Sequence, residues 1–494
     1  MQLTPPRLRA ALLAAASVAL LGAGLPAPGP LGIGDPLFPN LGNPGYDVLS
    51  YDIDLTYGGD NSKPLAAVTT IRARATQRLE HLNLDFAHGT VQSVDVNGTR
   101  AGFTTTGEDL VITPAKAVRE GRRTVITVKH TSNPAANSAD GGWVRTADGL
   151  AMANQADAAH RVFPCNDHPS DKAYFTFRVT APKGRTVVAN GLPAAAPRTL
   201  KGLKGAKDGV SWTYRTRHPM ATELAQVSIG DSAVLHRTGP HGLPVRDVVP
   251  AADTELLEPW LRKTPEHLRW MEERVGRYPF ETYGVLVAQA TTGFELETQT
   301  LSLFERGLFT GTGFPEWYVD SIMVHELAHH WFGNSVSPRS WSDLWLNEGH
   351  ATWYEALYAD KHRPLEARMK AAYGQSDGWR RAGGPPAAPR PSEPGQKISI
   401  FRPVVYDGSA LVLYALRQEV GEAAFATIER RWVSGHRDSV ATTKDFVTLA
   451  SEVAGRDLAP FFEQWLYGER TPPMPGHPDW RSATADGPGR PANH

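Results

Sequence analysis

The sequence predicts two domains, the first built from β-strands and the second mostly from helices. Its 494 residues are too many for one ordinary domain. In the first half, apolar and polar residues alternate in short runs, as around Tyr51 and Ile53, which is typical of half-buried strands. Later, apolar residues recur at helical spacing, first over 256–275. We therefore expect a β-rich domain over 45–237 and a helical domain over 238–470.

Three segments have more specific signatures. Residues 91–96 alternate and end at Asn97-Gly98, the dipeptide most typical of a tight hairpin, so a further strand should follow. Residues 317–332 and 341–361 carry apolar side chains at the spacing of a helix. We expect these two helices to follow one another closely in the second domain.

Three other segments are rich in Pro and Gly, which favour loops over regular structure. Residues 29–44 are expected to form an extended linker before the first strand. Residues 374–396 are expected to form a loop within the helical domain. The polar tail over 471–494 is expected to have no fixed structure.

The N-terminus has the three-part pattern of a secretory signal peptide, assigned to residues 1–28. Arg7 and Arg9 precede an apolar run over 10–21, and small residues and prolines follow. The run is short for a membrane span, and no later segment is apolar enough to be one. The alternative is an apolar helix that belongs to the fold. We expect a secreted, extracellular protein with no integral membrane segment in the mature chain.

Composition narrows the range of partners. The 51 Lys and Arg residues nearly balance the 52 Asp and Glu residues, so no net field attracts nucleic acid, and none is expected as a partner. The only cysteine, Cys165, cannot form a disulfide within the chain. It could be a nucleophile, but a small buried side chain is the favoured interpretation.

The strongest chemical signal is a short motif in the first of the two helices. His325 and His329 are four residues apart, so both imidazoles leave the same face of the helix and can bind one ion. Glu326 projects near that face, where its carboxylate can take a proton from a water that the metal has acidified. The motif is short enough to arise by chance, so a third ligand is needed to support it.

Glu348 is the candidate third ligand. It follows His329 by nineteen residues and lies in the next expected helix, within Trp345-Leu346-Asn347-Glu348-Gly349. Two packed antiparallel helices would bring it beside the histidine pair. Two His, one Glu and an open fourth position form a catalytic zinc site, so one Zn²⁺ per chain is expected, although such a site can also accept cobalt or manganese.

With these residues in place, the sequence resembles the aminopeptidase N family of zinc peptidases. His325, Glu326, His329 and Glu348 coincide one for one with that family's motif, and the family's zinc-bound water nucleophile implies Glu326 as the general base. His330 stands where the family often has Gln. It points about 100° around the helix from His329 and is not expected to bind the metal.

The resemblance extends to a loop before the zinc helix, Gly293-Phe294-Glu295-Leu296-Glu297. The family has Gly-Ala-Met-Glu-Asn there, and its Glu binds the free α-amine of the substrate. Glu297 takes that place, with Glu295 as a rival. Gly293 is carried over as a weaker substrate contact, because the family's Gly and Asn are not kept in register.

Two further segments match. Tyr406, in Val405-Tyr406-Asp407-Gly408, corresponds to the family's Tyr that hydrogen-bonds the oxyanion, although the family's Lys is missing here. Alone, it would be interpreted as an aromatic residue that caps a helix. The segment from Phe163 to Asp167 resembles a signature of the family's β domain, and Gln155 upstream is a candidate substrate contact.

The resemblance covers residues from about 45 to 470. It implies a saddle-like β-sheet domain packed on a thermolysin-like catalytic domain, and the family's long C-terminal helical domain has no counterpart in this sequence. The function it implies is a zinc aminopeptidase acting on peptides with a free N-terminus. Three alternatives remain: a secreted zinc endopeptidase on the same site, a hydrolase of another substrate such as an epoxide, and a non-catalytic binding protein that keeps the fold.

Overall fold

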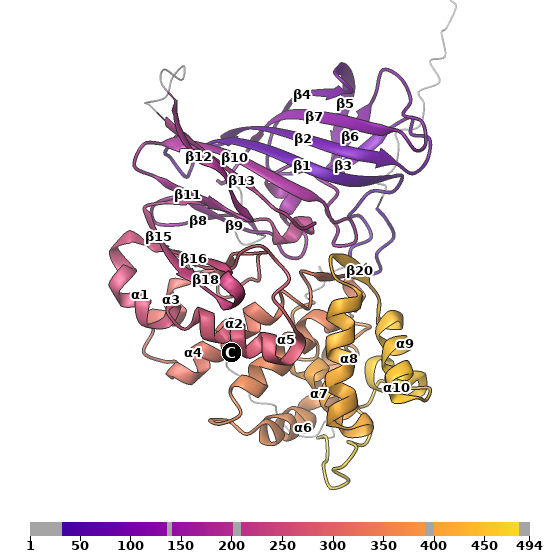
Figure 1. Ribbon diagram of the computed structural model, residues 1–494. Coiled ribbons are helices and arrows are strands. Elements are labelled where there is room, and N and C mark those ends of the chain that lie inside the picture. Colours follow the sequence, from indigo (N-terminus) through magenta and orange to yellow (C-terminus); the bar gives the residue numbers. More distant parts are fainter. Residues whose placement is uncertain (1–31, 136–140, 201–208, 391–399, 484–494) are drawn as a thin grey trace, which may run out of the picture.

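The fold follows the predicted order, with strands first and helices after. The computed structural model describes residues 32–135, 141–200, 209–390 and 400–483. The predicted signal peptide, residues 1–28, lies outside them. In Figure 1 the strands of the first half form the upper part of the molecule, and the helices of the second half form the lower part. The predicted combination of a β-sheet domain with a helical domain is confirmed.

A ten-stranded sheet forms the body of the first domain, in the order β12-β13-β10-β1-β2-β7-β4-β5-β6-β3. Its strands are β1 (Tyr46–Thr56), β2 (Leu65–Ala75), β3 (Leu82–Asp85), β4 (Val91–Val96), β5 (Thr99–Thr106), β6 (Asp109–Thr113), β7 (Arg123–Ser132), β10 (Tyr174–Pro182), β12 (Leu192–Leu200) and β13 (Gly209–Arg215). The alternation in β1 buries Tyr51, Ile53 and Leu55, because successive side chains of a strand point to opposite faces. The predicted hairpin is present as β4 and β5, with positive φ angles at Asn97 and Gly98.

A second, smaller sheet has the order β11-β14-β9-β8. Its strands are β8 (Gly142–Arg145), β9 (Leu150–Ala153), β11 (Thr186–Ala189) and β14 (Val227–Gly230). Figure 1 shows it between the large sheet and the helical domain. Strand β9 ends two residues before Gln155, so this sheet places Gln155 at the junction of the two domains.

The second domain combines two short sheets with ten helices among the described residues. Its strands are β15 (Ser232–Thr238), β16 (Pro244–Pro250), β17 (Val285–Ala288), β18 (Ser302–Glu305), β19 (Val336–Pro338) and β20 (Ser439–Ala441). Its helices are α1 (Thr254–Leu261), α2 (Thr264–Val275), α3 (Arg306–Thr310), α4 (Glu316–Ala328), α5 (Trp345–Tyr358), α6 (Leu365–Gly383), α7 (Asp407–Val420), α8 (Glu422–Gly435), α9 (Thr443–Ala454) and α10 (Ala459–Tyr467). Helix α5 packs against both α4 and α7. It is buried along most of its length, as a helix at the centre of a domain must be.

One predicted loop is wrong in part. Residues 374–396 were expected to be irregular, yet α6 continues to Gly383. Arg380, in this stretch, is 2% exposed, and its guanidinium donates to the carbonyl oxygens of Trp465 (2.7 Å) and Gly468 (2.7 Å). These distant contacts outweigh the weak helix preference of the local sequence.

The prediction of an unstructured tail is also wrong for residues 471–483, which pack on the helical domain. Trp480 is 4% exposed, and its ring stacks on Tyr414 at a centroid distance of 5.8 Å. The burial of this ring and hydrogen bonds such as that from the Tyr373 hydroxyl to the Pro472 carbonyl oxygen (3.1 Å) fix the segment.

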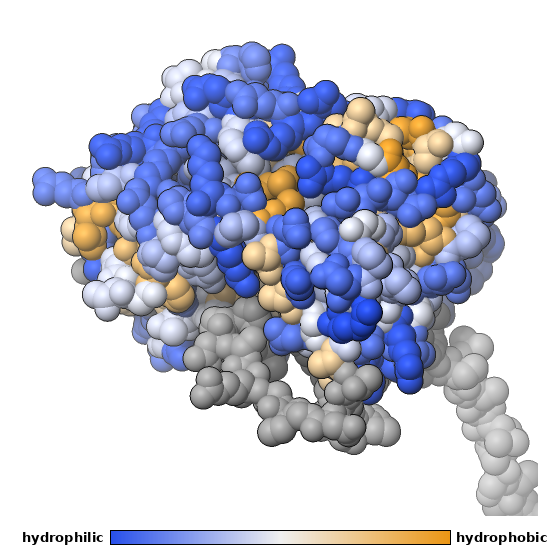
Figure 2. All heavy atoms as spheres, turned by 90° about the horizontal axis from the view of Figure 1, so that it is seen from below, coloured by the Kyte–Doolittle hydropathy of each residue, from blue (hydrophilic) through white to orange (hydrophobic). Residues whose placement is uncertain are grey.

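No helix in the described part of the chain is long and apolar enough to cross a membrane. The face in Figure 2, seen from below Figure 1, shows apolar residues in separate small patches among hydrophilic ones. On this face, the molecule presents no broad apolar surface.

Candidate active site and metal centre

Two helices bring the predicted metal ligands together. His325 lies in the last turn of α4, and His329 is the residue that follows the helix. Glu348 lies in the first turn of α5. Because α4 and α5 pack together, Glu348 Oε2 lies 3.5 Å from His325 Nε2 and 3.4 Å from His329 Nε2. All three side chains are buried.

This donor set fits a zinc ion. Ligand atoms at about 2.0–2.1 Å from a tetrahedral zinc lie about 3.3 Å from one another, which is close to the two distances above. Glu348 Oε2 is buried and has no hydrogen-bond partner among the described residues. An unpaired buried oxygen is costly unless a cation or water occupies the space beside it. His325, His329 and Glu348 are therefore the residues that would hold zinc.

A second carboxylate, which the sequence analysis missed, orients His325. Glu355 Oε2 lies 3.1 Å from His325 Nδ1, the outer contact typical of a metal-binding histidine. Burial alone would raise the pKa of Glu355, but the Arg368 guanidinium at 2.6 Å and His325 lower that pKa to about 2. Glu355 follows Glu348 by seven residues, or two helical turns. That spacing was the available sequence signal.

Glu326 lies beside the metal ligands with a free oxygen. Its carboxylate is within 4.8 Å of the ligand atoms of Glu297 and His329. Its Oε2 is buried and lacks a hydrogen-bond partner within the described residues. Burial raises the pKa of Glu326, and the negative charge of Glu297 raises it further. A carboxyl group with a raised pKa can both accept and return a proton near neutral pH.

Glu297 is held from several sides. Leu296, the residue before it, pairs with Leu303 of β18. Gln155 Nε2 donates to Glu297 Oε1 at 2.6 Å, and Asn334 Nδ2 donates to the Glu297 backbone oxygen at 2.7 Å. The structure therefore brings Gln155 of the first domain and Glu297 of the second domain together at the site.

The neighbours of Glu297 are placed differently. Glu295 is half-buried, and its burial, together with the charge of Glu305, raises its pKa to about 7. Gly293 is exposed, and its N–H donates to Glu305 Oε2 at 3.0 Å, so this donor is already engaged. Of the two carboxylates weighed for the amine-binding role, Glu297 is the one in contact with Gln155.

Tyr406 faces the metal ligands from the start of α7. Its ring lies 6.1 Å from the His325 ring, between centroids, at an interplanar angle of 29°. The side chain makes no capping hydrogen bond to α7. Burial, followed by the charges of Glu348 and Glu297, raises the pKa of the phenol well above its ordinary value. Tyr406 therefore keeps its proton at neutral pH and remains a hydrogen-bond donor.

His330 is turned away from this site, as expected from its position on the helix. Its Nδ1 lies 2.8 Å from the Tyr278 hydroxyl, and its Nε2 lies 3.1 Å from Ser302 Oγ. Both ring nitrogens are thus engaged elsewhere. Burial lowers the pKa of His330 well below its ordinary value, so the ring is a neutral part of the core.

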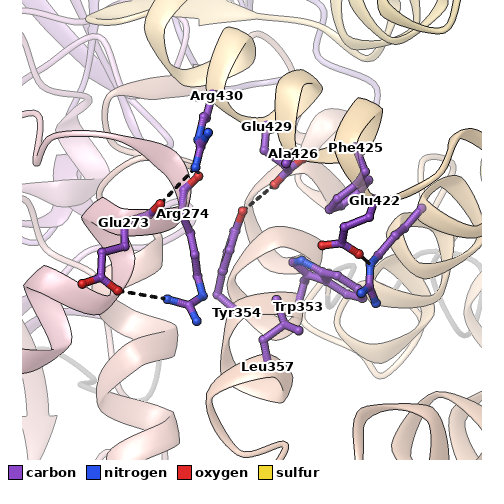
Figure 3. A pocket seen from close by; sticks show the side chains of 11 residues that line it. Glu273, Arg274, Trp353, Tyr354, Leu357, Glu422, Phe425, Ala426, Glu429 and Arg430 are labelled. Atoms are coloured by element: carbon purple, nitrogen blue, oxygen red, sulfur yellow. Dashed lines mark hydrogen bonds and ion pairs between the residues drawn. The ribbon is translucent and has the colours of Figure 1, made fainter.

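A cavity of about 470 Å³ borders the opposite face of α5 (Figure 3). Trp353 and Tyr354 are among its lining residues. In Figure 3 the Tyr354 hydroxyl points to Glu429, to which it donates at 2.9 Å. None of the predicted site residues lines this cavity, which is therefore separate from the metal centre.

Comparison with known proteins assigns both halves of the chain to one family. Residues 46–224 match the peptidase M1 N-terminal domain, and residues 261–465 match the peptidase family M1 domain. An aminopeptidase N from Streptomyces lividans is 25% identical over 455 residues, which cover 85% of this chain and 50% of that protein. A leukotriene A-4 hydrolase homologue from Botryotinia fuckeliana is 26% identical over 445 residues, which cover 82% of this chain and 65% of that protein. The chain thus spans between half and two thirds of the length of these two relatives.

Solved structures match over a larger share of their length. An M1 zinc metallopeptidase from Deinococcus radiodurans superposes with a TM-score of 0.75 at 27% identity, covering 90% of this chain and 99% of that chain. A mutant of that enzyme bound to a Tyr-Ser-Ala substrate gives the same TM-score at 28% identity. With His325, His329 and Glu348 gathered around one position, these matches show that the chain belongs to the M1 family of zinc metallopeptidases.

Proposed function

We propose that this protein is a zinc aminopeptidase that removes residues one at a time from the free N-terminus of peptides. The observation that carries the proposal is the position of Glu297, a buried carboxylate held by Gln155 and lying beside Glu326 and His329. A substrate ammonium bound there places the first peptide bond one residue away, a reach of about 3.5 Å. A blocked amine would leave the carboxylate buried without its charge partner, which is costly.

Each residue of the site has a separate role in peptide-bond hydrolysis. Zinc, when bound, supplies a Lewis acid that polarises the scissile carbonyl and acidifies water. Glu326 takes a proton from the attacking water as its oxygen bonds to the carbonyl carbon, and returns that proton to the amine nitrogen as the C–N bond breaks. Tyr406 donates its O–H to the carbonyl oxygen as negative charge develops there. Glu297 holds the ammonium, and Gln155 orients Glu297.

Two comparisons support peptides as the substrate class. Several of the relatives are named aminopeptidases, including the one from Streptomyces lividans. The Deinococcus radiodurans enzyme is described with a Tyr-Ser-Ala substrate. We also propose that the protein is secreted, on the pattern of residues 1–28 alone.

The test is a digest of one peptide in two forms, free and N-acetylated, followed by mass spectrometry. We expect residues to leave one at a time from the free form only. A chelator should abolish this activity, and added zinc should restore it. Internal cleavage of both forms would instead identify an endopeptidase on the same site. Cleavage of neither form by zinc-loaded protein would favour a non-catalytic binding protein.

A further inference from the structure

A segment ahead of the first strand lies between the two domains, next to the active site. Residues 33–43, here called the clasp, form neither helix nor strand. The clasp is nevertheless packed, since Asp35, Phe38, Leu41 and Asn43 are between 2% and 8% exposed. Buried polar side chains in an irregular segment need specific partners, and the clasp finds them in both domains.

Asp35 binds the turn that leads into α5. Its Oδ2 accepts hydrogen bonds from the Ser340 hydroxyl (2.8 Å) and the Trp341 backbone N–H (2.9 Å). Its Oδ1 accepts from the backbone N–H groups of Leu37 (2.8 Å) and Phe38 (3.0 Å). The same Oδ2 also lies 3.2 Å from His168 Nε2 of the first domain. One buried carboxylate thus joins the clasp both to the first domain and to the start of the helix that carries Glu348.

Asn43 binds the other end of the clasp to the first domain. Its backbone N–H donates to Asn166 Oδ1 at 2.6 Å, and its side-chain Nδ2 donates to Asp85 Oδ2 at 2.9 Å. Asn83 Nδ2 completes the set by donating to Asn43 Oδ1 at 2.6 Å. The clasp is therefore tied to both domains: Asn43 contacts the first domain, and Asp35 contacts both.

The apolar side chains of the clasp pack against the three segments that carry Gln155, Glu348 and Tyr406. Phe38 and Leu41 belong to a small buried cluster whose other buried members are Ala156, Trp341, Leu344, Ile400, Val404 and Val405. Ala156 follows Gln155, Leu344 lies one helical turn before Glu348, and Val405 precedes Tyr406. The Phe38 ring packs edge-on against Trp341 at a centroid distance of 5.7 Å.

We propose that the clasp is a positioning element of the active site, with Asp35 and Phe38 as its positioning residues. They hold the start of α5, and through it Glu348, at a fixed place relative to the segments that carry Gln155 and Tyr406. Side chains that hydrogen-bond a metal ligand directly change affinity or activity about 10- to 100-fold when lost. Asp35 and Phe38 act through Ser340 and Trp341, so we expect the lower end of that range. The effect on Gln155 and Tyr406 rests on the proposed function, whereas the effect on Glu348 does not.

Two variants of the holoenzyme test this proposal. Asp35→Asn keeps the size of the side chain, but its amide would direct N–H groups either at Trp341 or, if flipped, at Leu37 and Phe38. Phe38→Ala removes the ring that packs on Trp341. The matched control is Ile71→Val, a fully buried change in strand β2 of the large sheet, which lowers stability without touching the clasp.

The first readout is the rate at which zinc is lost to a chelator, and the second is kcat and KM on a free-amine peptide. We expect both variants to lose zinc about tenfold faster than the control at an equal distance below their melting temperatures, with a lower kcat. Zinc loss and kcat equal to those of Ile71→Val would overturn the proposal, because the clasp would then only support the fold.

A double-mutant cycle of Phe38→Ala with Tyr406→Phe measures the coupling between the two effects on kcat. A general loss of stability does not change this coupling. We expect the two effects on kcat to be non-additive. If Phe38→Ala has already displaced Tyr406, removing the Tyr406 hydroxyl lowers kcat less than it does in the wild type. Fully additive effects would contradict positioning of Tyr406. If the wild type cleaves no peptide, the proposed function fails, while the zinc-loss comparison still decides whether the clasp positions Glu348.

Discussion

Besides Glu348, helix α5 contributes to two further buried carboxylate–histidine pairs, and only one of these two includes a residue of the metal centre. On one side, Glu355 of α5 lies 3.1 Å from His325 Nδ1 of α4. On the other side, Glu429 of α8 lies 3.2 Å from His350 Nε2 of α5. All four side chains are buried, so burial and pairing alone do not distinguish them.

The difference lies in the second nitrogen of each ring. His350 Nδ1 lies 2.6 Å from the Leu346 carbonyl oxygen, and the ring stacks on Phe332 at 4.2 Å between centroids. No nitrogen of His350 is left for a ligand. His325 Nε2 instead faces Glu348, whose own oxygen lacks a hydrogen-bond partner in the described part of the chain. Of the two paired histidines, only His325 has its other nitrogen facing an unpaired carboxylate oxygen, and only His325 can therefore share a metal ion with that carboxylate.

The largest effect should come from replacing the carboxylate of Glu348. We expect Glu348→Gln to lower zinc affinity and kcat/KM by more than about a hundredfold, beyond the range seen for residues outside the ligand set. The neutral amide keeps the size of the side chain but is a much poorer zinc ligand. Metal analysis after dialysis checks this. Full zinc content at wild-type affinity would show that Glu348 is not a ligand.

The second-largest effect should distinguish Glu355 from Glu429 by what each contributes to zinc binding. We expect Glu355→Gln to reduce zinc affinity or kcat/KM by about 10- to 100-fold, because it orients His325. The matched control, Glu429→Gln, should leave both unchanged and lower the free energy of unfolding by about 1–3 kcal/mol. Zinc titration and urea unfolding of both variants measure this. Equal loss of zinc affinity in the two variants would mean that the pairs do not differ as described.

The smallest effect is expected from Tyr354→Phe, on the cavity side of α5. It removes the hydroxyl that donates to Glu429 Oε2 at 2.9 Å. We expect a loss of about 1–2 kcal/mol in the free energy of unfolding and no change in kcat/KM. A lower kcat/KM well below the unfolding temperature would show that this side of the helix is coupled to the metal centre.

The grouping of His325, His329 and Glu348 could be predicted because local rules fix it. His325 and His329 share one helix face wherever the helix packs, and Glu348 follows at a spacing that a helical turn-back can bridge. Glu355 obeys the same rule, since two helical turns separate it from Glu348 and place both carboxylates on one face of α5. For these residues, local geometry carries most of the information.

Contacts between distant parts of the chain could not be derived in this way. Gln155 and Glu297 are 142 residues apart, and their hydrogen bond depends on how the two domains pack. The family resemblance suggested Gln155 only as a substrate contact, and nothing in the sequence predicted its bond to Glu297. Phe38 meets Trp341, and Trp480 meets Tyr414, through tertiary packing. Composition correctly predicts that the segments around Phe38 and Trp480 lack helix and strand. It cannot predict that they are buried.

We propose above that buried Glu297 selects the free N-terminus of the substrate, and the variant Glu297→Gln tests this role. We would measure kcat/KM for a free peptide, together with zinc content, in the wild type and in Glu297→Gln. We expect kcat/KM to fall about a hundredfold at full zinc content, since a buried partner of the ammonium charge is lost. An unchanged kcat/KM at full zinc content would contradict it.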